Sequence, residues 1–462
     1  MFNNNENKEL VSKPSRIITN IINSDKNTFV ILKFTFAIAV TILGLLRLII
    51  AFQLLSPPYL YHKDIIQEYI LGRAIIEGVE PYLPLPMLVN RFVGDIPVDV
   101  LPHATPHPPF VAVFSIPFGF ITLEQTAAFW LLFELICLFW IAYRLSDWFF
   151  RGNRSKWIFA SFSFFLLLFT QPVWEELIYG QLMILLLLLL VELWISMRNK
   201  RSIRAGIYLG LAVSIKLIAW PFLIFWMIKK EWKTLVTSLI SIALTNLTAA
   251  IVVGSVQFIH YFLKISTEVY AIYRGFNFSS SSLGWRMFEK TGTEAVPSIH
   301  ASPLIYSPGL ATVTSIIIPV VFLMVGVISS LKSSSIDISV GILVLTILLV
   351  SPVVWYHYFV LAIIPFCIAL KHSFQLKIRP IDSLLLLSGL CLFAIPNSTP
   401  IRFLSFITKT FTNQADQSSL PFALSMFTYI FPLLVIGLFV LLIRYSRYST
   451  QIENPLINKS MI

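Results

Sequence analysis

Asp64 opens a segment whose residue types could move a proton. Over residues 64–77 apolar side chains recur at helical spacing, and Asp64 and Glu68, four positions apart, share the opposite face. Gly78 and Pro81 then predict the end of a short amphipathic helix at the outer membrane surface. A carboxylate here could act as a general base. It could equally be a helix cap on a solvated face, and the spacing leaves both interpretations open.

Lys216 is the second residue of this kind, because it lies near the middle of the apolar run 206–228. A lysine at the centre of a membrane segment costs about 2.5–3.5 kcal/mol on insertion scales, which makes it a functional candidate. An anionic phosphate is its natural partner. The alternative is snorkelling to the membrane surface, which the distance to either end of the run disfavours.

Three further positions carry polar groups that could bind a sugar or orient a phosphate. Gln181 follows Gly180 at the start of an apolar run, His357 lies in the aromatic stretch 351–358, and Asn277 lies in the polar stretch 276–282. The alternatives are interfacial polarity for the glutamine and a membrane-surface aromatic belt for 351–358.

Membrane helices must position these residues. Hydrophobic residues make up 57% of the 462-residue chain, charged residues only 12%, and the mean hydropathy is +0.80. A soluble domain carries about 25% charged residues. Runs of roughly 20 apolar residues can span a bilayer as helices. They are predicted at 28–54, 126–145, 178–197, 206–228, 234–254, 309–331, 380–396 and 421–443, with shorter ones at 109–122, 157–171, 337–351 and 354–370. The sequence predicts an all-α polytopic bundle of about 11–13 segments.

Charge along the chain predicts its orientation. Short links at 151–156, 198–204, 229–233 and 371–379 are basic, so they and both tails are predicted to be cytosolic. The resulting organisation is a tail (1–27), an N-terminal transmembrane module (28–254) that contains a first outer loop (55–108) with the amphipathic helix, a second outer loop (255–308), a C-terminal transmembrane module (309–443) and a tail (444–462). Long ordered loops are usually functional.

Two segments conflict with simple alternation across the membrane. Basic clusters flank both ends of 206–228, so a full crossing would place one of them outside. A break at Lys216 into two half-helices would return both ends to the cytosol. The segment 109–145 must cross an odd number of times, although it looks like two spans.

Several function classes are excluded. The net charge of +11 lies in short loops between apolar runs, which excludes nucleic-acid binding. The three cysteines, Cys137, Cys367 and Cys391, lie in apolar runs without metal or redox spacing. No phosphate-binding glycine loop, nucleophile elbow or metal-ligand cluster is present, so neither a cofactor nor a metal is predicted. An enzyme of this kind would need an activated, membrane-borne substrate.

Taken in order, the motifs resemble those of glycosyltransferase family 87, polyprenol-phosphate-sugar-dependent enzymes of the GT-C fold that include bacterial α-mannosyltransferases. The family's D-x-x-x-Y-Y element is matched by Asp64 and Tyr69, with Glu68 where a tyrosine is common. The other matches are G-x-x-P-Y ending at Tyr82, Y-P-P present as His107-Pro108-Pro109, Gly180-Gln181, G-x-x-x-G-L-A-x-x-x-K ending at Lys216, and S-P-x-x-W-x-H ending at His357.

The resemblance implies a mannosyltransferase-like enzyme in the bacterial cytoplasmic membrane, with its active site facing outside. It would move a hexose, mannose first, from a polyprenyl-phosphate donor to a hydroxyl of a lipid or glycan acceptor of the cell envelope, with inversion. Asp64 would be the general base and Lys216 would neutralise the phosphate. His357, Gln181, Glu68, Tyr69, Tyr82 and Asn277 would bind substrate, and membrane lipid would surround the polyprenyl chain. The alternatives are a transporter or flippase for lipid-linked sugars, a cell-surface polysaccharide ligase or polymerase, and an inactive family member.

Overall fold

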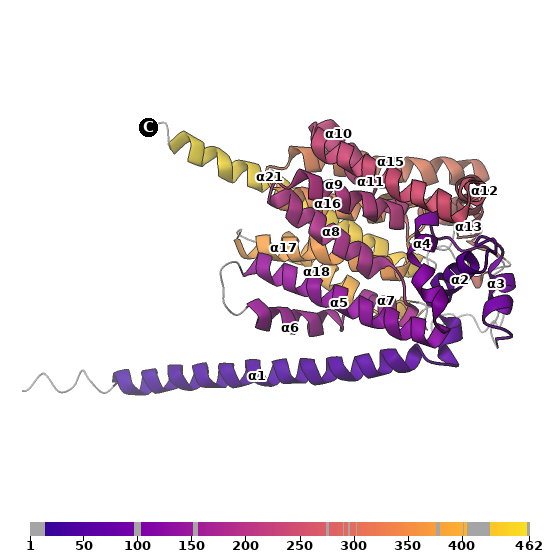
Figure 1. Cartoon of the computed structure of the whole chain (residues 1–462). Helices are drawn as coiled ribbons and strands as arrows, with labels where there is room; N and C mark the ends of the chain where they lie inside the picture. Colours follow the sequence, from indigo (N-terminus) through magenta and orange to yellow (C-terminus); the bar gives the residue numbers. More distant parts are fainter. Residues whose placement is uncertain are drawn as a thin grey trace, which may run out of the picture.

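The computed structural model is a bundle of helices (Figure 1). It describes residues 14–96, 103–150, 156–273, 277–289, 291–293, 296–301, 303–375, 379–400, 402–403 and 426–459. Within these ranges the chain is almost entirely helical, as predicted. A short antiparallel hairpin of β1 (Thr291–Thr293) and β2 (Val296–Ala301) is the exception among the described residues.

Six helical stretches among the described residues are long and apolar enough to cross a membrane. They lie in α1 (Pro14–Leu54), α5 (Leu123–Phe149), α11 (Trp232–Val253), α15 (Pro308–Lys332), η5 with α17 (Tyr356–Ala362 and Ile363–Gln375) and α21 (Ile430–Lys459). A seventh pair, α6 (Lys156–Leu167) and α7 (Gln171–Tyr179), is bent by 76°. The shorter helices are α8 (Met183–Arg198), α9 (Ser202–Ile215), α10 (Pro221–Lys229), α16 (Ile336–Val350) and α18 (Pro380–Ala394). The chain is therefore a multi-pass membrane protein. The total of 11–13 segments counts the shorter helices and stays a prediction.

The two long connections gather at one end of the bundle (Figure 1). The first contains η1 (Tyr59–His62), α2 (Ile65–Ile76), α3 (Leu85–Phe92), α4 (Pro109–Phe114) and η2 (Ile116–Phe120). The second contains α12 (Ser255–His260), the π-helical η4 (Tyr261–Ile265), α13 (Ser266–Tyr273) and α14 (Ser280–Phe288). The Tyr261 hydroxyl of the second donates to the Pro106 carbonyl of the first at 2.8 Å, which ties them together.

The run 206–228 is broken at Lys216, as predicted. Lys216 has extended backbone between α9 and η3 (Leu217–Ala219), and α10 follows. Helices α9 and α11 run parallel: Gly206 packs on Thr237, and Gly210 and Ser214 pack on Ser241 and Thr245, respectively. Since both helices start at the same level, α10 must bring the chain back to that level. Lys216 therefore lies at the tip of a re-entrant pair of half-helices.

The segment 109–145 contains one helix, α5, that is long and apolar enough to cross a membrane. The predicted short span at 109–122 is wrong, because α4 has 6 residues and η2 has 5. Ser115 and Pro117 interrupt that run, and only α5 is long enough to span. One candidate span is compatible with the odd number of crossings that the charge pattern predicts.

Two further expectations need correction. Helix α2 forms where predicted and ends before Gly78, but it is not an amphipathic surface helix, because most of its residues are buried and Glu68 is fully buried. Glu68 faces the interior of the end where the two long connections gather. The tails 1–27 and 444–462 are also partly helical, since α1 begins at Pro14 and α21 continues to Lys459; residues 1–13 and 460–462 lie outside the described ranges.

Ion pairs join helices toward the opposite end, where α1 begins and α21 ends (Figure 1). They include Arg144–Glu192 at 2.6 Å between α5 and α8, Arg198–Asp337 between α8 and α16, and Asp382–Arg444 at 2.7 Å between α18 and α21. Charges at membrane depth are tolerated when they are paired. These contacts link the helices at the end away from the two long connections.

Sidedness can be tested without a substrate. In a cysteine-free background, we expect a cysteine at the exposed Glu80 to react with an impermeant maleimide from outside the cell. A cysteine at Ser202 should react only after the membrane is opened, because it precedes the re-entrant pair in a basic link. Labelling of position 202 in intact cells would reverse the predicted orientation.

Candidate active site

A cavity of about 760 Å³ opens at the end of the bundle where the two long connections gather, between the first of them and the tip of the re-entrant pair. Such a volume is in the range of small-molecule sites. Its walls include four of the predicted site residues, Asp64, Gln181, Lys216 and His357. Further lining residues are Lys63, Gln67, His103, His107, Glu175, Tyr179, Tyr261, Trp355, Tyr358 and Asn397.

The Asp64 carboxylate faces this cavity. Asp64 precedes α2, but its side chain makes no capping hydrogen bond, so the helix-cap interpretation is wrong. Gln67 Nε2 donates to Asp64 Oδ1 at 3.4 Å, and the Gln181 side chain also hydrogen-bonds the carboxylate. Burial raises the pKa of Asp64, while the Gln181 hydrogen bond and the Lys216 charge oppose the rise. The result is a carboxylate suited to accept a proton.

Gln181 is positioned by the turn between α7 and α8. Gly180 ends α7 in the left-handed conformation, with φ of 69°. A side chain at Gly180 would collide with Ile65 of α2, 2.8 Å from its Cβ. Glu176 caps α8 by accepting from the backbone N–H groups of Met183 and Ile184. The glycine and the cap together bring Gln181 against Asp64.

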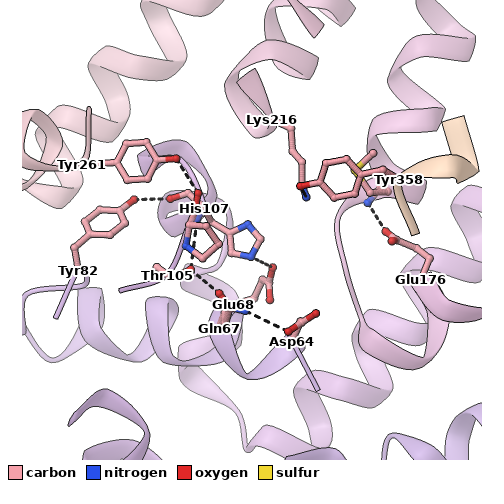
Figure 2. A network of polar contacts seen from close by, with 12 residues as sticks. Asp64, Gln67, Glu68, Tyr82, Thr105, His107, Glu176, Lys216, Tyr261 and Tyr358 are labelled. Atoms are coloured by element: carbon pink, nitrogen blue, oxygen red, sulfur yellow. Dashed lines mark hydrogen bonds and ion pairs between the residues drawn. The ribbon is translucent and has the colours of Figure 1, made fainter. Parts of the chain in front are cut away.

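Lys216 is brought to the cavity by the helix break. Its side chain is 8% exposed, and Nζ donates to the Tyr358 hydroxyl at 2.9 Å while lying 4.2 Å from the ring centre (Figure 2). It forms no salt bridge with a described residue. The break therefore argues against snorkelling, because the Lys216 ammonium group faces a cavity instead of lipid. It could bind an anion there.

An extended turn after α16 leads into η5, whose second residue is His357. Asn277 accepts from the Val354 N–H at 3.3 Å, and the hydroxyls of Ser279 and Ser281 donate to the Pro352 carbonyl at 3.0 and 3.2 Å. Asn277 is buried and is not a lining residue. It holds the turn that presents Trp355, His357 and Tyr358.

Glu68 and Tyr82 lie behind the cavity wall. Glu68 Oε1 is 3.2 Å from Nε2 of His107, and the Tyr82 hydroxyl donates to the His107 carbonyl at 2.9 Å (Figure 2). Both predicted residues therefore contact a lining residue without lining the cavity themselves. Tyr69 lies on another side of α2, with Arg73, Glu77 and Glu124 as its charged neighbours.

The sequence interpretation missed two buried carboxyl groups, Glu134 and Glu176, which lie near Glu68 and feel one another's charge. Glu134 lies inside the predicted span 126–145. An ionisable residue inside an apolar span is a functional candidate, so Glu134 qualifies on the same ground as Lys216. Glu176 directly precedes the Gly180-Gln181 turn, but its capping role has no sequence signal. Tyr358 lies in the aromatic stretch 351–358, whose composition is also typical of a membrane-surface aromatic belt.

The arrangement combines a proton acceptor, a cation and ring-bearing walls in one cavity. No group of three His, Cys, Asp or Glu side chains in the described ranges is placed to hold a metal ion. Asp64 can take a proton from a bound hydroxyl, and Lys216 can stabilise a phosphate. The lining aromatic rings suit sugar faces or apolar chains.

Comparisons with known proteins found a family and a relative. The model of glycosyltransferase family 87 matches residues 105–352, just over half of the chain. An alpha-(1->3)-arabinofuranosyltransferase of Corynebacterium glutamicum is 31% identical over 172 residues, which cover 35% of this chain and 40% of that relative. The match thus spans less than half of the relative's length. No solved structure matches the chain.

Proposed function

The chain belongs to glycosyltransferase family 87, and from this membership and the cavity we propose that it transfers a sugar from a polyprenyl-phosphate donor to a hydroxyl of a lipid or glycan acceptor. The observation that carries the proposal is the shared cavity of Asp64 and Lys216. One supplies the base and the other supplies the anion site. No nucleotide-binding element is needed, because the donor is already activated.

The sugar-transfer step needs one carboxylate. The acceptor hydroxyl attacks the anomeric carbon, and Asp64 takes its proton as the new carbon–oxygen bond forms. The bond between the anomeric carbon and the phosphate oxygen breaks at the same time. The electron pair leaves with the polyprenyl phosphate, which is a stable anion and needs no acid. Attack from the face opposite the leaving group inverts the anomeric configuration.

Lys216 meets the charge that develops on the leaving phosphate. The buried ammonium group has the Tyr358 hydroxyl as its hydrogen-bond partner, which leaves its charge uncompensated by any ion pair with the described residues. A phosphodiester bound here would gain negative charge as the bond breaks, so the interaction strengthens in the transition state. His357 lies on the same wall and would orient the phosphate or the sugar.

The cavity lies at the end formed by the two long connections, away from the start of α1 and the end of α21 (Figure 1). Together with the basic charge of the short links, this supports an active site on the extracytoplasmic side of a bacterial cytoplasmic membrane. The acceptor would then be a component of the cell envelope, and the polyprenyl chain would extend into surrounding lipid.

For the sugar, a hexose remains the first candidate, with mannose favoured by the motif resemblance. The name of the Corynebacterium relative adds arabinofuranose as a second candidate. The test is to incubate the full-length protein in lipid nanodiscs with radiolabelled polyprenyl-phosphate mannose, glucose, galactose or arabinofuranose and a bacterial lipid extract. Movement of label to an acceptor with inverted configuration supports the proposal and names the donor.

The same preparation separates the rival functions. A flippase would move the intact donor across proteoliposomes without breaking the sugar–phosphate bond. A ligase or polymerase would require a lipid-linked oligosaccharide and ignore monosaccharide donors. Either result, without transfer from any single-sugar donor, would contradict the proposed function.

The pH profile should report Asp64. Its carboxylate is the active form, and burial raises its pKa, so kcat/KM should fall as the pH drops through a value above the ordinary carboxyl range. Gln181→Leu removes the hydrogen bond that opposes this rise, so the acid limb should move to higher pH. The same change at the exposed Gln53 is the matched control and should leave the limb in place. An unshifted limb in Gln181→Leu would mean that another group sets it.

A further inference from the structure

The Glu68–His107 pair has no role in the transfer chemistry described above. Both side chains are almost completely buried, at 0% and 4% exposed, and Glu68 Oε1 lies 3.2 Å from His107 Nε2. His107 nevertheless lines the cavity. A buried acid placed behind a cavity-lining imidazole is the arrangement by which enzymes fix which ring nitrogen carries the proton.

The protonation state of the pair follows from its burial. Burial raises the pKa of Glu68 well above its ordinary value and lowers the pKa of His107 to about 3. Glu68 is fully buried and has no lysine or arginine within ion-pair distance among the described residues, which favours its neutral form. In that form its carboxyl O–H faces the Nε2 lone pair. A neutral imidazole that accepts at Nε2 must carry its hydrogen on Nδ1.

The backbone around His107 is fixed from both sides. Tyr82 donates to its carbonyl at 2.9 Å, and Tyr261 donates to the preceding carbonyl, of Pro106, at 2.8 Å. No described residue hydrogen-bonds Nδ1. Because Nε2 lies against the Glu68 carboxyl group at 3.2 Å, Nδ1 is the ring nitrogen left for a ligand in the cavity.

A polar network connects the backbone of His107 to Asp64 (Figure 2). Gln67 Nε2 donates to Asp64 Oδ1 at 3.4 Å, Thr105 Oγ1 donates to Gln67 Oε1 at 3.0 Å, and the His107 N–H reaches Thr105 Oγ1 at 3.5 Å. One wall of the cavity thus presents an acceptor, the Asp64 carboxylate, and a donor, His107 Nδ1–H. Two neighbouring hydroxyls of one ligand complement this pair.

We propose that Glu68 fixes His107 as an Nδ1–H donor and that His107 holds the acceptor hydroxyl adjacent to the one that Asp64 deprotonates. The second half rests on the proposed function, since it presumes a bound acceptor. His107 is thereby an acceptor-binding residue, and Glu68 is a positioning residue that acts through it. The device favours acceptors with vicinal hydroxyls over simple alcohols.

Kinetics test the binding role, with octyl α-D-mannopyranoside and its monodeoxy derivatives as acceptors for the donor that the panel identifies. His107→Phe keeps a ring but loses the donor. It should raise the acceptor KM roughly 5- to 150-fold, the range for leaving one buried hydrogen-bonding group unpaired, with an unchanged donor KM. With the unsubstituted protein, one monodeoxy acceptor should show a similar rise in KM relative to octyl α-D-mannopyranoside. With His107→Phe, the KM for that monodeoxy acceptor should rise no further. His260→Phe, outside the cavity, is the matched control.

Two substitutions of Glu68 separate positioning from packing. Glu68→Gln keeps a donor toward Nε2, so acceptor KM and the Nδ1–H tautomer should both survive. Glu68→Leu removes that donor, so the KM should rise as in His107→Phe. The tautomer is read by ¹⁵N-histidine NMR of the full chain in nanodiscs, with the His107 signal identified by its loss in His107→Phe.

The outcomes distinguish this inference from the proposed function. If transfer occurs and His107→Phe leaves the acceptor KM unchanged, the inference is overturned and the function stands. If no donor supports transfer, the function fails. The inference then depends on octyl mannoside binding, measured by tryptophan fluorescence, which His107→Phe must weaken. An Nε2–H tautomer in the unsubstituted protein overturns it in every case.

Discussion

Replacing Asp64 with asparagine should reduce transfer about 10²- to 10⁴-fold, the usual loss on removal of a general base. The amide keeps the size of the carboxylate but cannot accept the proton of the attacking hydroxyl. Donor binding should persist, because Lys216 and the surrounding walls remain in place. The measurement is single-turnover transfer by the purified protein, with donor affinity measured separately.

The matched control for this change is Asp95→Asn, the same substitution at an exposed position of the first long connection. It should transfer at the normal rate. If Asp64→Asn also turns over normally, Asp64 is not the base. Glu68 would be the next candidate, but its contact with His107 and its burial behind the wall make direct access to an acceptor unfavourable.

Lys216→Met should lower transfer roughly 10²- to 10³-fold, as removal of a preorganised stabilising group does elsewhere, and should weaken donor binding. Methionine keeps the apolar stem and loses the charge, so the half-helix tip should still pack. Without an ion pair to break among the described residues, thermal stability in detergent should be retained or increased. Arginine should restore only part of the activity, because its planar fork replaces a compact point charge.

Lys229→Met provides the control, since it makes the same change at the exposed end of α10, on the same re-entrant pair. It should leave transfer and donor affinity unaltered. A Lys216→Met protein that is stable and fully active would remove Lys216 from the phosphate site. One that unfolds would make the lysine a structural residue, and the donor-site proposal would need another cation, such as Lys63.

The sequence by itself determined the membrane class, the two long connections and the break at Lys216. These follow from one-dimensional quantities, because the bilayer penalises every unpaired charge and every backbone group left without a hydrogen bond. The order of the motifs also identified Asp64, Lys216, Gln181 and His357, and the structure brings all four to one cavity.

Only the tertiary structure decided what each carboxylate faces. Periodicity assigned Glu68 to the same polar face as Asp64, but α4, α5 and η2 cover that helix and bury Glu68 against His107, 39 positions along the chain. The same packing turned Tyr82 and Asn277 into supports for lining segments. A helical pattern records which side chains share a face; whether that face meets water, lipid or another buried polar group depends on contacts between distant segments, and no local spacing encodes those.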